Sequence, residues 1–335
     1  MYCQESLKVN SKPIDDIIYR YRTAHMLNAA VENGIFTRLT TPKGAPRLAE
    51  EIHHNPRTTE KLLNVLVANG LLIKSEEEYH DSIVAQTFLA EGGQNYIGNL
   101  VRITVGCSTL LDHLNDRLKK GPALQDEIDF DRVQLLGHAE GALCEELGPV
   151  MDVIKSMAEF SRSKRILDLG GGHGVYSIAL AQSNPSSSVA LFDRPNIIEF
   201  AKEFIAKYEM DDKIRFISGD FNADDIGTGY DIVFISHVLY LSSDLNSVLR
   251  KIYNSLNDGG IVVLNHWMLD DCRTSPKVSV IFDLYLSLIS RNYGCHTISE
   301  FVELLINAGF GDVRIFDIRT PYSPSMIVVG LKKKS

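Results

Sequence analysis

Paired cysteines, an excess of positive charge and long apolar runs are all missing from this sequence. The five cysteines are scattered without a Cys-x-x-Cys pair, which is typical of a reducing compartment and offers no zinc-binding pattern. No apolar stretch approaches the ~18 residues that span a bilayer, and a net charge of −9 disfavours a nucleic-acid partner. The first residues show no basic region followed by an apolar one, so no signal peptide is expected. These absences predict a cytoplasmic protein without a metal centre, a membrane span or a nucleic-acid partner.

The composition is that of an ordinary globular protein. Apolar residues make up 44% and charged residues 23% of the 335 positions, a length that suits two domains with a core each. Changes in pattern along the chain predict three parts. These are an α-rich domain over 1–95, a helical linker and substrate lid over 96–160, and an α/β domain over 161–335.

One glycine-rich segment organises the α/β domain. Residues 164–174 read Lys-Arg-Ile-Leu-Asp-Leu-Gly-Gly-Gly-His-Gly, and an amphipathic pattern begins at Val175. This order predicts a strand, a tight turn and a helix. Glycines at Gly170, Gly172 and Gly174 allow a sharp turn and a close approach of a ligand to the backbone. The helix that follows presents free N–H groups, so the segment predicts a nucleotide-type site.

The glycine spacing separates two kinds of nucleotide site. A dinucleotide fingerprint requires G-x-G-x-x-G. The sixth position counted from Gly170 is Val175, and from Gly172 it is Ser177, so neither register fits. An acid, Asp168, precedes the glycines, which suits a ligand that carries an ammonium group. The spacing therefore disfavours a nicotinamide-dependent reductase.

Further polar residues follow the next predicted strands. Asp193 ends the apolar run 188–192, about twenty residues beyond the glycines, where a carboxylate binds ribose hydroxyls. Asp220 and Phe221 follow the third strand and can bracket an adenine ring. The segment Ser236-His237-Val-Leu-Tyr240 follows the fourth strand, at the edge where open α/β sheets bind ligands. Five alternations of strand and helix with a closing antiparallel pair predict a Rossmann-like sheet.

The first part of the chain has the pattern of a winged helix. Helices are predicted over 14–33, 46–52 and 58–69, followed by two short strands over 71–79. A winged helix raises the possibility of a DNA-binding regulator. The hairpin tip, however, carries three successive glutamates at 76–78, which would repel phosphate. A dimerisation and lid module is the favoured interpretation.

Two long helices are predicted between these parts, over 96–118 and over about 133–160. They would cover the ligand site, so that His138 could face a substrate. Trp267 and Met268 follow the fifth strand and could wall a flat, apolar acceptor.

The order and spacing of these motifs resemble the S-adenosylmethionine (SAM)-dependent O-methyltransferases of the hydroxyindole and plant caffeate type. The resemblance covers nearly the whole chain and rests on segments 29–36, 167–174, 192–195, 218–221, 257–260 and 304–310. It implies a winged-helix dimerisation domain, a class I methyltransferase domain with an antiparallel last strand, and a homodimer. It further implies SAM as the cofactor, bound by Asp168, Gly170, Gly172, Asp193, Asp220, Phe221 and Ser236.

One position departs from the family pattern. The family carries a His-Asp pair after the fourth strand, and its histidine removes the proton of the acceptor hydroxyl; here Tyr240-Leu241 stand there. Tyrosine, with a pKa near ~10, is a poor base at neutral pH. Another histidine (His237, His138 or His266) could take the proton, or the acceptor could arrive already anionic. Alternatively the acceptor is a carbon and Tyr240 positions it, as in the bacteriochlorophyll ring C-methyltransferase of this family.

The sequence thus predicts SAM-dependent methyl transfer to a small, aromatic or conjugated acceptor, at oxygen or carbon. Tyr240, His237 and His266 are the predicted catalytic residues, and His138, Trp267 and Met268 the predicted substrate-binding residues. Two alternatives remain: a SAM-binding protein of this fold without methyl transfer, and a winged-helix transcriptional regulator.

Overall fold

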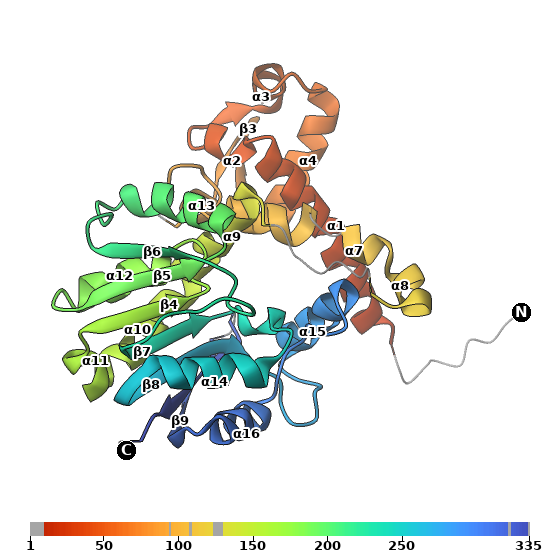
Figure 1. Cartoon of the computed structure of the whole chain (residues 1–335). Coiled ribbons are helices and arrows are strands. Elements are labelled where there is room, and N and C mark those ends of the chain that lie inside the picture. The colour runs from red at the N-terminus through yellow and green to blue at the C-terminus, as the bar shows by residue number, and fades with distance from the viewer. Residues whose placement is uncertain (1–9, 94, 107–108, 123–129, 321–322, 334–335) are drawn as a thin grey trace, which may run out of the picture. The chain divides into compact units, whose positions relative to one another are not determined.

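The computed structural model describes residues 10–93, 95–106, 109–122, 130–320 and 323–333 (Figure 1). The chain divides into two compact units, Met1–Thr109 and Leu110–Ser335. The division falls inside the predicted linker 96–160, so the two ends of that segment belong to different units.

The first unit consists of helices around a small antiparallel sheet. Its helices are α1 (Lys12–Glu32), α2 (Ile35–Arg38), α3 (Ala45–Glu51), α4 (Pro56–Ala68), α5 (Ile83–Phe88) and α6 (Gly98–Val101), followed by a π-helical turn over Arg102–Gly106. Strands β1 (Lys43–Gly44), β2 (Leu72–Ser75) and β3 (Glu78–Asp81) pair in the order β1-β3-β2. The hairpin predicted over 71–79 is confirmed, because Ser75 pairs with Glu78 across its turn.

Helix α1 leaves large apolar side chains uncovered within this unit. Ile14, Ile17 and Tyr21 are each more than 60% exposed. The same helix buries Ala30 and Val31 at its other end, where the core contains Phe36. Exposed apolar surface of this extent on one helix is typical of an interaction face.

A buried acid without a partner lies at the end of β3. Asp81 is only 9% exposed, and neither carboxyl oxygen has a hydrogen-bond partner among the described residues. Burial raises the pKa of Asp81 to about 7. The folded state therefore binds this proton more tightly than the unfolded chain does. Its stability is expected to fall as the pH rises from about 4 to about 7.

We expect Asp81→Asn to flatten this pH dependence. The variant cannot ionise, so above pH 7 it avoids a cost of about 2 kcal/mol or more in the free energy of unfolding. The melting temperature, followed from pH 4 to pH 8, should decline less in the variant than in the wild type. Asp16→Asn is the matched control, because the Asp16 side chain is half exposed in an ion pair with Lys12. An unchanged slope for Asp81→Asn would contradict the expectation.

The second unit is built on a seven-stranded mixed sheet. Its strands are β4 (Arg165–Leu169), β5 (Ser188–Asp193), β6 (Ile214–Ser218), β7 (Tyr230–Ser236), β8 (Leu256–Trp267), β9 (Gly311–Asp317) and β10 (Ser325–Leu331). They pair in the order β6-β5-β4-β7-β8-β10-β9. β10 runs antiparallel to both neighbours, whereas the pairs from β6 to β8 are parallel. The predicted Rossmann-like sheet with an antiparallel last strand is confirmed.

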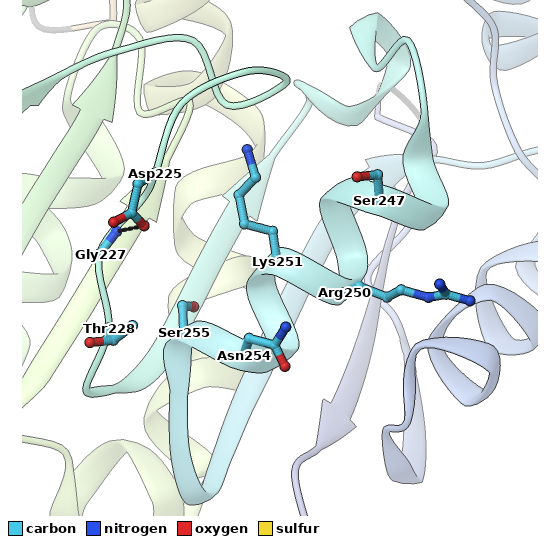
Figure 2. A pocket seen from close by; sticks show the side chains of 8 residues that line it. All are labelled: Asp225, Gly227, Thr228, Ser247, Arg250, Lys251, Asn254 and Ser255. Atoms are coloured by element: carbon cyan, nitrogen blue, oxygen red, sulfur yellow. Dashed lines mark hydrogen bonds between the residues drawn. The ribbon is translucent and has the colours of Figure 1, made fainter.

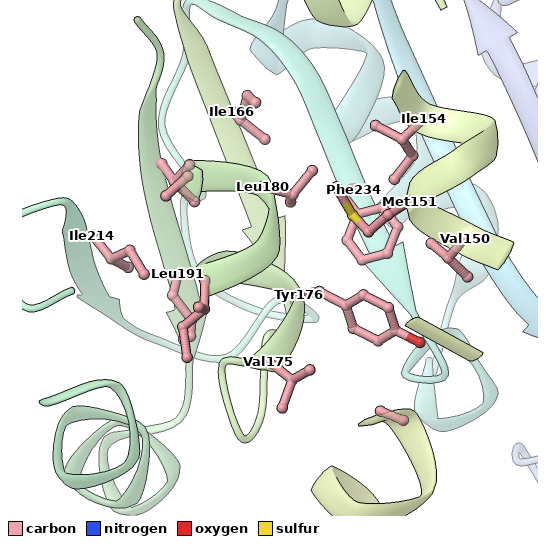
Figure 3. Packing of buried hydrophobic residues seen from close by; sticks show 14 of the residues in the cluster. Val150, Met151, Ile154, Ile166, Val175, Tyr176, Leu180, Leu191, Ile214 and Phe234 are labelled. Carbon is pink, nitrogen blue, oxygen red and sulfur yellow. The ribbon is translucent and has the colours of Figure 1, made fainter. Parts of the chain in front are cut away.

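Helices cover both faces of this sheet (Figure 1). One face packs against α10 (Leu147–Ser156), α11 (Ala158–Arg162), α12 (Val175–Ser183) and α13 (Pro195–Ala206), and the other against α14 (Leu245–Ser255) and α16 (Ile298–Ala308). Successive strand residues alternate between the two cores, so that Ile166 belongs to the first and Leu167 to the second. Figure 3 shows the first core. The ring centroids of Tyr176 and Phe234 in this core are 5.1 Å apart.

The linker helices are more broken than the sequence predicts. The second unit also contains α7 (Thr109–Asp112) at the division, α8 (Leu114–Lys120), α9 (Arg132–Gly141), a π-helical turn over Ala142–Glu146, a 3-10 turn over Leu239–Leu241 and α15 (Lys277–Ile289). The single helix predicted over 96–118 is wrong, because the π-helical turn Arg102–Gly106 interrupts it. Glycine at 98 and 106 lowers the helix propensity of that segment. The helix predicted over 133–160 contains the second π-helical turn and ends at Ser156, where Met157 is extended.

Candidate active site

The glycine loop after β4 has an open side. Gly170 and Gly172 have φ angles of 71° and 53°, in the region that favours glycine. A Cβ atom at Gly170 would lie 2.7 Å from Cγ1 of Val238, so a side chain there is excluded. At Gly172, by contrast, a Cβ atom would meet only the carbonyl oxygen of Gly170, at 3.9 Å. The loop therefore leaves room beside Gly172 for a ligand.

Asp193 lies at this open side, at the end of β5. Its Oδ2 accepts the N–H of Gly172 at 2.9 Å, and its Oδ1 accepts the N–H of Arg194 at 2.8 Å. Burial raises the pKa of Asp193, and these two N–H donors oppose the shift. A carboxylate has about four acceptor positions, so two remain for ligand hydroxyls. The two acceptor positions that remain on Asp193 fit the ribose hydroxyls of a nucleoside cofactor.

Asp168 supports the loop from within the core. Its side chain is buried, and its Oδ2 accepts the hydroxyl of Ser177 on α12 at 2.6 Å. Burial raises the pKa of Asp168 to about 7, although the hydrogen bond from Ser177 opposes the shift. As placed, Asp168 ties β4 to α12. Contact of Asp168 with a cofactor stays a prediction.

The other predicted cofactor residues lie at the ends of neighbouring strands. Asp193 pairs with Ser218 across β5 and β6, which places Asp220 and Phe221 just beyond the same edge. Asp220 is exposed, with Oδ1 accepting the N–H of Asn222, and Phe221 is partly buried. At the end of β7, the hydroxyl of Ser236 accepts a hydrogen bond from Asn265. Contact of Asp220, Phe221 and Ser236 with a cofactor stays a prediction.

The segment after β7 brings the predicted catalytic residues together. His237 has a φ of 53°, an uncommon value for a residue with a side chain and one that marks functional sites. Its Nδ1 lies 3.1 Å from the Tyr240 hydroxyl oxygen, which accepts the N–H of Trp267 at 2.5 Å. Burial raises the pKa of Tyr240 well above its usual value. At neutral pH Tyr240 therefore stays a protonated phenol, with even less of the phenolate form that could act as a base.

A carboxylate that the sequence analysis missed completes this cluster. Oε2 of Glu146, in the second π-helical turn, lies 2.7 Å from Nε2 of His237. Four further donors reach the same carboxylate, and together with His237 they form what we term the Glu146 network: Trp267, Ser323, Ser325 and Tyr176. Burial opposes ionisation, but the interaction with His237 and the hydrogen bonds from these donors hold the pKa of Glu146 well below its usual range. Glu146 is thus a buried, fully bonded carboxylate.

One sequence signal could have found Glu146. It lies four residues before Val150, which lies four residues before Ile154, and both of these side chains are buried. Such spacing places all three on one helix face. An acid on the inward face of an apolar helix is rare unless it has a partner.

The remaining predicted residues differ in access. His266 is fully buried, and its Nε2 accepts the N–H of Leu239. As placed, it therefore does not reach a methyl acceptor. Met268 is buried in the second core of the sheet. Trp267 is only partly buried, and His138 on α9 is exposed with its ring against Phe130. Trp267 and His138 are therefore the accessible members of the predicted substrate set.

A separate hollow lies beside α14 (Figure 2). It encloses about 340 Å³ between that helix and residues 225–228, which precede β7. Lys251 lines it, but its ammonium group already donates to the carbonyl oxygens of Phe221 and Asp224. Ligands of open α/β sheets bind at the carboxyl ends of the strands, whereas this hollow is lined by residues that precede β7 and by α14.

Among the residues that the structure describes, no group of three or more His, Cys, Asp or Glu side chains could hold a metal ion. No helix among those residues is long and apolar enough to cross a membrane.

Comparison with known proteins gives consistent matches. Residues 142–311 match the O-methyltransferase domain family, and residues 16–91 match the O-methyltransferase dimerisation domain. An uncharacterized protein of Methanocaldococcus jannaschii is 32% identical over 77% of this chain and 70% of its own length. The tetracenomycin polyketide synthesis 8-O-methyl transferase TcmO of Streptomyces glaucescens is 27% identical over 92% of this chain and 93% of its own. The solved structure of human N-acetylserotonin methyltransferase in complex with SAM covers 100% of both chains with a TM-score of 0.82 and 19% identity.

Proposed function

The chain belongs to the O-methyltransferase family and is a SAM-dependent methyltransferase, and from this premise we propose that it methylates a hydroxyl group of a small aromatic or conjugated molecule. The observation that carries the proposal is the hydrogen-bonded series Glu146–His237–Tyr240, at the carboxyl end of β7. Tyr240 in this series stands where the family carries its catalytic histidine.

In this reaction the chain's own residues bind the nucleoside, hold the methyl acceptor and take up its proton. SAM supplies a methyl group on a sulfonium, which is already a good leaving group. The glycine loop leaves room for the nucleoside beside Gly172, and the carboxylate oxygens of Asp193 accept hydrogen bonds from its hydroxyls. Trp267 and His138 border the acceptor, which must be held in line at roughly ~3 Å from the methyl group with water excluded.

His237 takes the acceptor proton in this proposal. Nε2 faces the carboxylate of Glu146, so Nδ1 is the nitrogen that gains the proton. The Tyr240 oxygen lies 3.1 Å from Nδ1 and can accept from it, because the Tyr240 hydroxyl has a second acceptor in the carbonyl oxygen of Trp267 at 3.4 Å. The O–H bond of the methyl acceptor breaks, and its oxygen takes the methyl group while S-adenosylhomocysteine leaves with the electron pair of the methyl–sulfur bond. The protonated imidazole then has a hydrogen-bond acceptor for each N–H. A carboxylate behind a histidine serves the same purpose in serine hydrolases.

Carbon methylation is the second candidate. Both ring nitrogens of His237 already have partners, and Tyr240 stands where the family has its base. An acceptor that is already an anion or an electron-rich carbon needs alignment rather than a base. The position of the new methyl group, read from the product, separates this candidate from O-methylation.

We also propose a homodimer. Residues 16–91 match a dimerisation domain, and the exposed apolar side chains of α1 fall within and beside this range. Light scattering that shows a mass of 37.4 kDa would contradict it, because that is the mass of one chain.

Product analysis tests the proposed reaction. The protein is incubated with methyl-labelled SAM and a panel of phenols, hydroxynaphthalenes and hydroxyindoles. We expect S-adenosylhomocysteine and an O-methylated product in equal amounts. S-adenosylhomocysteine bound without turnover on any acceptor would favour a SAM-binding protein without methyl transfer.

A further inference from the structure

We propose that Glu146 is the positioning residue of this site: it fixes His237 in the tautomer that carries its proton on Nε2 and keeps the lone pair on Nδ1. The importance of this tautomer for catalysis rests on the proposed function, in which Nδ1 receives the acceptor proton. The tautomer itself does not depend on methyl transfer and can be measured without a methyl acceptor.

The two oxygens of Glu146 have different partners. Oε1 accepts from the indole N–H of Trp267 at 2.9 Å and from the hydroxyls of Ser325, at 2.8 Å, and Ser323. Oε2 lies 2.7 Å from Nε2 of His237. An ionised carboxylate only accepts hydrogen bonds, so Nε2 must donate and carry the proton. In the neutral ring, Nδ1 is then an acceptor, and the hydroxyl of Tyr240 at 3.1 Å can donate to it.

Several other histidines surround the hydrogen bond between Glu146 and His237. His237 interacts electrostatically with three other histidines from three elements, and with Glu146 as its hydrogen-bonded carboxylate: His138, His173 and His266. The hydroxyl of Tyr176 on α12 also reaches Oε2 of Glu146, at 3.3 Å. Positive charge on several neighbouring imidazoles is unfavourable. Among these imidazoles, His237 is the one that Glu146 holds by a direct hydrogen bond.

The backbone supports a functional role for both partners. Glu146 ends a π-helical turn, a feature that occurs frequently at functional sites. His237 has a positive φ angle, which also concentrates at such sites. The two residues lie 91 positions apart, so two unusual backbone conformations meet at one hydrogen bond.

Glu146→Gln is the decisive variant because glutamine has nearly the same shape. Three donors hold the Oε1 position, so the amide oxygen is expected there and the amide N–H2 group opposite Nε2 of His237. Nε2 must then accept, and the ring proton moves to Nδ1. Long-range 1H–15N spectra of histidine-labelled protein with S-adenosylhomocysteine report this exchange directly. His237→Gln assigns the signal, and Glu145→Gln, one residue away, is the matched control and should leave the tautomer unchanged.

A change of tautomer in Glu146→Gln, absent from Glu145→Gln, supports the proposal. An unchanged His237 tautomer in folded Glu146→Gln would overturn it. If the variant does not fold, the wild-type spectrum decides, because a neutral His237 with its proton on Nδ1 also overturns the proposal. Once an acceptor is found, Glu146→Gln should lower kcat with little change in KM for SAM. Failure to find methyl transfer would count against the proposed function and leave the spectral result standing.

Discussion

Asp193→Ala is expected to weaken S-adenosylhomocysteine binding by about 100-fold or more. The proposed interaction is two ribose hydroxyls donating to one carboxylate, and hydrogen bonds to a charged group contribute about 1.5–3 kcal/mol each. About 1.4 kcal/mol corresponds to tenfold in affinity. The variant also removes the acceptors of the Gly172 and Arg194 N–H groups, so the loop loses its anchor. Calorimetric titration of the dialysed protein measures the change.

Asp225→Ala is the control for this titration. Asp225 follows β6 and its Oδ1 also accepts a backbone N–H, from Gly227, but it lines the separate hollow beside α14. The affinity of Asp225→Ala for S-adenosylhomocysteine should match that of the wild type. If Asp193→Ala is folded and binds as tightly as the wild type, the ribose role of Asp193 is refuted. If the wild type itself does not bind, the nucleoside site at the glycine loop is refuted.

His237→Gln is expected to lower kcat by about 10²–10⁴, the usual contribution of a general base. Glutamine can still bond to Glu146 and Tyr240 but cannot take up a proton at neutral pH. Affinity for S-adenosylhomocysteine should change little, since the ribose interactions proposed for Asp193 are untouched. Single-turnover rates at saturating SAM, with the acceptor found by product analysis, measure the effect.

Two further variants show which group acts as the base. His138→Gln removes the exposed histidine of α9 and should lower kcat less than His237→Gln does. Tyr240→Phe removes the hydroxyl that faces Nδ1 and should act through His237, so it should add little in the double variant. A larger loss in His138→Gln would transfer the role of base to His138. A small effect of all three variants would favour an acceptor that needs no base.

Much of the second unit could be predicted because its signals are local. The run 166–169, the glycines and the apolar pattern from Val175 specify strand, turn and helix within a dozen residues. The final antiparallel strand followed from the order of elements. Helix continuity was harder to predict, since Arg102–Gly106 and Ala142–Glu146 adopt π-helical turns. Side-chain periodicity hardly distinguishes these from α-helix.

The sequence by itself indicated a nucleoside cofactor and predicted the edge of the sheet for its site, because glycine spacing and an acid after the next strand are chemical requirements of short range. Only the tertiary structure brought together the groups to which we assign the proton chemistry. Glu146 meets His237 across 91 residues, Trp267 across 121 and Ser323 across 177. Folding also buried His266 and Met268, which the sequence placed at the acceptor. Hydrogen bonds between distant strands depend on how helices and strands pack, and no local pattern records that packing.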